Sequence, residues 1–123
     1  AEIPGYSKFG RWAGTSNSQT ANFDGPFIDC GFKPAAVWVK GCGAAESWVM
    51  VDSTRDPDNP VGSTLRPNAA AAEVETSTSQ PIDFVSNGFK IRTGEGQWNF
   101  NSSGYYIYCA WAENPFQAPV PAR

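Results

Sequence analysis

The sequence predicts an all-β fold, an antiparallel β-sandwich of roughly seven to nine short strands with at most one short helix near residues 69–75. Twelve glycines and ten prolines interrupt the chain every several residues, as is typical of short strands joined by turns. Aromatic residues make up 14% of the chain and occur in short runs without a helical period. With 123 residues the chain can build one real core, so we expect a single domain over residues 1–123.

The N-terminal half alternates apolar runs with turn residues. Phe23-Asp24-Gly25-Pro26 is a turn signal, and Pro34 directly precedes Ala35–Lys40, an apolar run that suits a central strand. Gly41–Glu46 is typical of a hairpin connection into the next run. The strands expected in this half cover residues 6–14, 27–30, 35–40 and 47–52.

The C-terminal half begins with an irregular segment. Asp56-Pro57-Asp58-Asn59-Pro60 cannot form regular structure, and because the EF-hand order is absent we interpret it as a solvated turn rather than a calcium loop. Ala69–Glu75 is the one helix-like segment, since Asn68 can cap it, although about two turns are marginal alone. Asn87-Gly88 predicts a hairpin turn with positive φ, and Gly94–Gly104 a polar loop. The strands expected in this half cover residues 82–85, 89–92 and 105–113.

The charge of the chain disfavours some classes of partner. Its formal net charge of −3 and its pI near 4.8 argue against nucleic-acid binding, which needs a clustered basic surface, and the lysines and arginines are scattered. No apolar run approaches the roughly 20 residues of a bilayer-spanning helix. We therefore expect neither a nucleic-acid partner nor membrane insertion.

The three cysteines, Cys30, Cys42 and Cys109, cannot all pair within the chain. None belongs to a Cys-x-x-Cys arrangement, and the chain has no histidine to complete a zinc site. We expect free, buried thiols that act as small apolar residues, and one disulfide remains the alternative. No metal and no other cofactor is expected.

Catalytic motifs are scarce in this sequence. Without histidine, a Ser-His-Asp or Cys-His mechanism is excluded for this chain alone, and no phosphate-binding glycine loop is present. Two carboxylates about 5–9 Å apart in a cleft could hydrolyse a glycosidic bond, but almost any pair would meet so loose a requirement. We therefore expect no catalytic residues and no enzyme. The acids available in principle are Glu46, Asp52, Asp56, Asp58, Asp83, Glu95 and Glu113.

The candidate binding residues are aromatic side chains in loops. Trp98 lies in a glycine-rich polar loop, where we expect an exposed ring that could stack on a sugar. The alternative interpretation is that Trp98 and Trp12 plug the ends of the sandwich. We expect Trp38, Trp48 and Trp111 in the core. The expected contact surface is Gln97, Trp98, Asn99, Asn101 and Tyr105, with Arg11 and Trp12 as a second patch.

A family resemblance rests on motifs spread over nearly the whole chain. They are Pro4–Gly10, Gly31–Ala35, Asp52–Arg55, Ile82–Arg92, Tyr106–Tyr108 and Ala112–Phe116. In this order they resemble a domain that recurs in tailed-bacteriophage virion proteins, especially at the C-terminal end of tail fibres and other tail structural proteins. The resemblance implies the C-terminal part of a longer virion protein, made in the host bacterial cytoplasm and located in the tail. It brings no catalytic set with it.

The function expected from the resemblance and the loop aromatics is that of a phage tail fibre receptor-binding domain that recognises bacterial surface polysaccharide. Its partners would be that glycan and other tail-fibre segments, with a homotrimer as the assembly to test. The alternative is a structural virion module that caps, trimerises or decorates the tail without touching the host. A glycan hydrolase is a remote third alternative.

Overall fold

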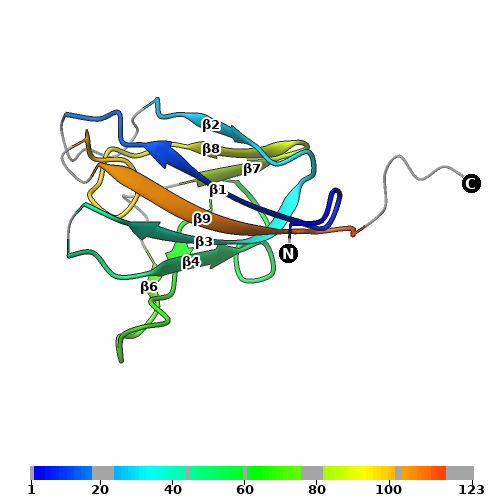
Figure 1. Cartoon of the computed structure of the whole chain (residues 1–123). Coiled ribbons are helices and arrows are strands. Elements are labelled where there is room, and N and C mark those ends of the chain that lie inside the picture. Colours follow the sequence, from blue (N-terminus) through cyan, green and yellow to red (C-terminus); the bar gives the residue numbers. More distant parts are fainter. Residues whose placement is uncertain are drawn as a thin grey trace, which may run out of the picture.

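The computed structural model describes residues 2–17, 24–43, 45–59, 61–75, 82–101 and 104–115. Within them the chain forms a four-stranded and a three-stranded antiparallel sheet that pack face to face, which confirms the predicted β-sandwich (Figure 1). Among these residues, no helix has the length and hydropathy to cross a membrane. The strands are β1 (Ser7–Ala13), β2 (Phe27–Asp29), β3 (Pro34–Gly41), β4 (Val49–Asp52), β5 (Ser63–Thr64), β6 (Val74–Glu75), β7 (Ile82–Val85), β8 (Gly88–Ile91) and β9 (Tyr105–Ala112).

The larger sheet has the order β1-β9-β3-β4, so the last strand of the chain lies between the first and the third. β9 pairs with β1 from Ser7↔Trp111 to Ala13↔Tyr105, and with β3 along its whole length. A register shift between Pro34 and Ala36 is the one irregularity in the β3–β9 pairing. Because a shift of one residue would turn every side chain to the other face, this pairing decides which aromatic residues are buried.

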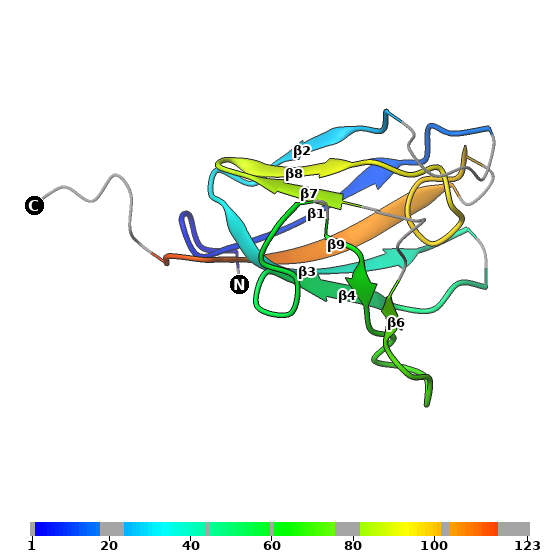
Figure 2. The ribbon, with the colours of Figure 1, turned by 180° about the vertical axis from the view of Figure 1, so that it is seen from behind.

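The smaller sheet has the order β2-β8-β7 and covers the other side of the core (Figure 2). Ser86 and Asn87 form the β7–β8 hairpin loop, and Gly88 is already paired with Val85. A Cβ atom on Gly88 would lie 2.0 Å from the carbonyl oxygen of Ile28, so this glycine permits the close approach of β2. Gly88 itself does not have the positive φ expected at the hairpin; among the described glycines, Gly5, Gly31 and Gly104 do, with φ of 76°, 76° and 70°.

Residues 69–75 do not form the helix that the sequence suggested. Residues 69–73 are irregular, and the next two residues form β6, which pairs with β5. The Asn68 side chain, expected to cap a helix, accepts a hydrogen bond from the backbone N–H of Trp48 at 3.1 Å. Because Ala69–Ala72 are exposed, a short helix here would have no apolar face to bury, and about two turns are not stable alone.

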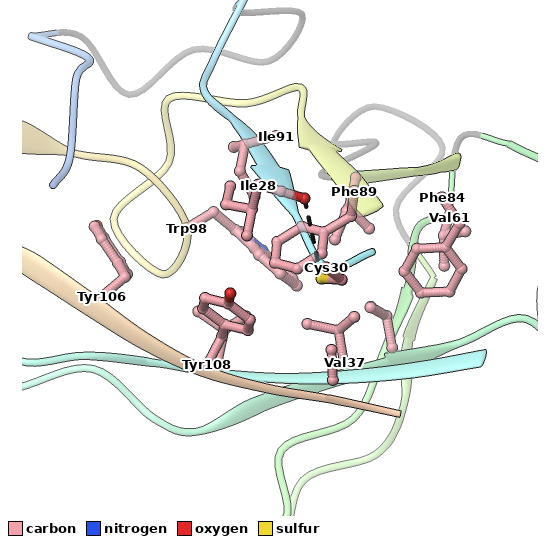
Figure 3. Close-up of a cluster of buried hydrophobic side chains, with 14 of the residues drawn as sticks. Ile28, Cys30, Val37, Val61, Phe84, Phe89, Ile91, Trp98, Tyr106 and Tyr108 are labelled. Carbon is pink, nitrogen blue, oxygen red and sulfur yellow. Dashed lines mark hydrogen bonds between the residues drawn. The ribbon is translucent and has the colours of Figure 1, made fainter. Parts of the chain in front are cut away.

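The core fills the space between the two sheets. Every second residue of β3, β4 and β9 points into it, and the smaller sheet contributes its own inward side chains (Figure 3). The buried apolar residues of these strands are Ile28, Val37, Val39, Val49, Val51, Ile82, Phe84, Phe89, Ile91, Tyr106, Tyr108, Ala110 and Ala112. Sequence alternation therefore translates directly into burial along these strands.

The tryptophans are distributed opposite to expectation. Trp98 and Trp12, expected at the surface, are buried, with only 2% and 7% of their areas exposed. Trp38, Trp48 and Trp111, expected in the core, are half-buried. Trp38 and Trp111 alternate with core residues and so lie on the opposite face of their strands. The alternative interpretation, in which the loop tryptophans plug the sandwich, is the correct one.

The three cysteines are free thiols in different environments. Cys30 is buried as expected, whereas Cys109 is half-buried and Cys42 is exposed, so the expectation of three buried thiols is wrong for these two. Burial, helped by the neighbouring charge of Asp29, raises the pKa of the Cys30 thiol to about 12. Burial also raises the pKa of Cys109.

Replacing Trp98 by Ala should lower the free energy of unfolding by about 3–5 kcal/mol, because it removes a large ring from a packed site. Gln97→Ala, a change at a half-buried neighbour in the same loop, should change it by less than about 0.5 kcal/mol. Urea denaturation followed by tryptophan fluorescence and circular dichroism measures both. Equal, small effects would mean that Trp98 is not part of the core.

Alkylation with iodoacetamide at pH 8 should modify Cys42 first and Cys109 more slowly. Cys30 should react only after denaturant is added, because the thiolate is the reactive species and a buried thiol with a pKa of about 12 hardly ionises. Peptide mass spectrometry over time gives the three rates. Rapid modification of Cys30 in the native protein would contradict the packing of β2 against the larger sheet.

Candidate functional site

The loop from Gly94 to Gly104 is held against the end of the sandwich by buried hydrogen bonds. The Trp12 indole Nε1–H donates to the carbonyl oxygen of Trp98 at 3.1 Å. The Tyr106 hydroxyl accepts from the Phe100 N–H at 2.8 Å and donates to the Gly96 carbonyl oxygen. In Figure 3 the Trp98 ring points from this loop into the space between the two sheets. The loop is therefore a structural closure of the core.

Asn99, another expected contact residue, is fully buried in the same closure. Its Oδ1 accepts from the Thr15 N–H at 3.0 Å, and its Nδ2 donates to the Thr15 Oγ1 at 2.9 Å. A side chain so enclosed cannot touch a ligand in this fold, and the same holds for Trp98 and Trp12. The expectation that the Trp98 ring is exposed is wrong, because the ring packs in the core.

The other expected contact residues lie nearer to solvent. Gln97 is half-buried and Asn101 is exposed, and their part in binding stays a prediction. Arg11 and Tyr105, assigned by the sequence to two separate patches, form one patch on neighbouring strands. The guanidinium carbon of Arg11 lies 4.6 Å from the centroid of the Tyr105 ring. Such a cation–π contact at an exposed site is worth about 0.5–1 kcal/mol.

Arg11 and Tyr105 belong to a larger surface, the outer face of the four-stranded sheet, which points away from the core. Its members follow from the register, because residues paired across antiparallel strands share a face. In Figure 1 this face is turned toward the viewer, and no described element covers β9. The outer-face residues are Ser7, which is buried, Phe9, Arg11 and Ala13 in β1, Tyr105, Ile107, Cys109 and Trp111 in β9, Ala36, Trp38 and Lys40 in β3, and Met50 and Asp52 in β4.

Three rings form an aromatic strip across the outer face: Phe9, Trp111 and Trp38. Phe9 and Trp111 meet edge to face with centroids 6.4 Å apart, and Trp111 and Trp38 do so at 6.1 Å. Phe9 is 38% exposed and Tyr105, further along the face, is 51% exposed. Exposed apolar side chains scattered singly are ordinary, whereas aromatic rings in mutual contact at the surface form a contiguous apolar patch. We take the outer face as the candidate site.

Sequence reasoning missed this surface for an identifiable reason. Residues 105–112 are apolar at almost every position, so both faces of the strand resemble core. One signal was present at the end of this run, where the large Trp111 stands between the small Ala110 and Ala112. It becomes informative only when the pairing with Phe9 and Trp38 is known, because these residues are distant in the sequence.

Three of the acids considered for hydrolysis, Asp52, Asp83 and Glu113, form ion pairs. The Asp52 carboxylate accepts from the Arg55 Nε–H at 2.7 Å, and Arg55 also pairs with Glu73. Asp83 pairs with Arg92 at 3.1 Å. Glu113 pairs with Lys33 at 3.6 Å. These ion pairs lie on separate loops and strand ends and bring no two of the candidate acids together on the outer face.

Residues 56–59 are irregular, as the sequence predicted, and are held by hydrogen bonds. Asp56 Oδ2 accepts from the N–H groups of Gly62 and Ser63, at 2.7 and 2.8 Å. Partial burial raises the pKa of this carboxyl, but the two hydrogen bonds outweigh it and the net pKa is lowered. The Asn59 side chain bonds both the N–H and the carbonyl of Phe84, which ties this segment to β7. Within the described ranges, no three potential metal-ligating side chains cluster.

Comparison with known proteins identifies one family. Its model, a domain of unknown function designated DUF7483, matches residues 1–115. No curated protein and no solved structure matches the chain. The matched range contains every strand of both sheets, the closing loop and the outer face. The chain therefore belongs to the DUF7483 family.

Proposed function

We propose that this domain is the receptor-binding domain of a phage tail fibre and that it binds bacterial surface polysaccharide on its outer face. The observation that carries the proposal is the uncovered aromatic strip formed by Phe9, Trp111 and Trp38. A sugar ring has an apolar face that can stack on such side chains, while its hydroxyl groups hydrogen-bond to polar neighbours. Arg11, Lys40 and Tyr105 offer such groups beside the strip.

The rigidity of the sheet favours this use of the surface. Trp111 lies on β9, which is hydrogen-bonded on both sides, and its ring is supported by Phe9 on one flank and Trp38 on the other. Rings held in place before the ligand arrives lose little conformational entropy on binding. The surface is thus preorganised for an extended, repetitive ligand such as a polysaccharide chain.

The phage assignment is supported by the ordered motifs from Pro4–Gly10 to Ala112–Phe116 that resemble tail proteins. Several of these residues build the scaffold. Gly31 adopts positive φ, Gly88 allows β2 to approach, and Asp52 and Arg55 pair within a turn. The proposed role requires a scaffold that is common to tail proteins and presents a binding face. The role needs no catalytic group, so we propose a binding module rather than a hydrolase.

One observation favours the second candidate, a structural virion module. Ile107, Met50 and Cys109 add aliphatic and sulfur-containing surface to the outer face. Ile107 is 39% exposed, and such side chains suit packing against a protein surface. A second copy of the domain or another tail-fibre segment could then cover the face. Self-association in solution separates this role from glycan binding.

Phe9→Ala and Trp111→Ala should each weaken binding of the labelled domain to host bacteria by about 1–3 kcal/mol, since each removes a ring from the strip. Phe27→Ala is the matched control, because Phe27 is 45% exposed on β2, in the opposite sheet. Binding is measured by flow cytometry over a panel of bacteria, with and without enzymatic removal of surface glycans. The melting temperature of each variant confirms that it is folded.

The outcomes separate the two candidate roles. Binding that disappears with the glycans and with the strip variants supports recognition. Binding to no bacterium, together with a dimer or trimer in light scattering that Phe9→Ala dissociates, would instead favour the structural module. If Phe27→Ala is as harmful as Phe9→Ala, the outer face is not the site.

A further inference from the structure

Two cations on the outer face, Arg11 and Lys40, form no ion pair with another residue that the structure describes. Among the described residues, five of the lysines and arginines make ion pairs, namely Lys8, Lys33, Arg55, Lys90 and Arg92. Arg11 lies over the Tyr105 ring, and Lys40 Nζ donates to the Gly41 carbonyl oxygen at 2.6 Å. Neither contact neutralises the positive charge.

The register places these two cations in one row across the sheet. Arg11 pairs with Ile107 in β9, and Ile107 pairs with Lys40 in β3. Since neighbouring strands lie about 4.8 Å apart, the two Cα atoms are separated by roughly 10 Å. The row is adjacent to the one that contains Phe9 and Trp38, so the cations border the aromatic strip.

Two acidic residues lie near this row: Glu46 is beside Gly41, which follows Lys40, and Glu2 pairs with Lys8 at the edge of β1. The one acidic residue among the outer-face residues is Asp52, which shares its row with Ala36 and Trp111 and whose carboxylate is bound by Arg55. The chain as a whole carries a formal net charge of −3, yet the uncompensated charges of the outer face are positive. The surface is therefore complementary to an anionic ligand.

We propose that the ligand is a carboxylate-bearing polysaccharide, with uronic-acid residues that stack on the aromatic strip and carboxylates that bind Arg11 and Lys40. This inference rests on the proposed glycan-binding function. The planar guanidinium of Arg11, held over Tyr105, can offer two N–H donors to a carboxylate, whereas Lys40 supplies a compact charge. A neutral glycan would cover both cations without compensating their charge. Arg11 and Lys40 therefore also select against neutral glycans.

The test measures calorimetric binding of the folded domain to a panel of purified bacterial polysaccharides, some neutral and some containing uronic acids. Each acidic polymer is also used after chemical reduction of its carboxyl groups. We expect binding to acidic polymers, loss of binding after reduction, and weaker binding as salt is raised. Arg11→Gln and Lys40→Gln should each weaken binding by between about two- and tenfold.

The control variant is Arg92→Gln, which changes the net charge equally but lies just after β8, in the opposite sheet. It should bind as the wild type does. Arg11→Lys should keep the salt dependence and lose part of the affinity, because it retains the charge without the fork of donors. Binding of neutral polymers only, unaffected by Arg11→Gln and Lys40→Gln, would overturn this inference and leave the proposed function standing. Binding of no polymer in the panel would overturn both.

Discussion

The closure of the sandwich by Trp12 and Trp98 is the constraint on which the rest of the structure depends. The Trp12 indole donates a buried hydrogen bond to the Trp98 backbone, so the loop that carries Trp98 is tied to the first strand. The Trp12 ring stacks on Tyr106 at 5.5 Å and meets Phe89 edge to face at 5.8 Å. The Trp12 side chain thus contacts both sheets and the loop that closes the core. These contacts join residues that are far apart in the sequence.

This closure decides which surface remains for a ligand. Because Trp98 and Asn99 are enclosed, the loop end of the sandwich does not present the aromatic contact that its composition suggests. The side chains that β9 turns outward, supported by β1 and β3, form the aromatic surface instead. Binding at the centre of a rigid sheet has a physical advantage over binding at loops, because every strand holds its neighbours in register and little order is gained on binding.

The lysines and arginines also differ in whether they form ion pairs. Most cations of the described residues are used in ion pairs that fasten turns, such as Arg55 with Asp52 and Glu73. The pairs of Arg55 are half-buried, whereas that of Lys33 with Glu113 is exposed and contributes little to stability. Three cations, Arg11, Lys40 and Arg66, make no ion pair with any described residue, and of these Arg11 and Lys40 lie beside the aromatic strip.

The sequence by itself determined the fold class, the positions of the main strands and the irregular segment at residues 56–59, because these follow from local rules. Alternating apolar residues favour strands, and proline and glycine interrupt them wherever they occur. Only the tertiary structure decided which face of β3 and β9 is buried, why Gly88 must be glycine, and that Trp98 is core while Trp38 and Trp111 are surface. Each of these depends on a partner distant in the chain. An aromatic side chain by itself favours neither the core nor the surface. It is buried only where the opposing sheet covers it.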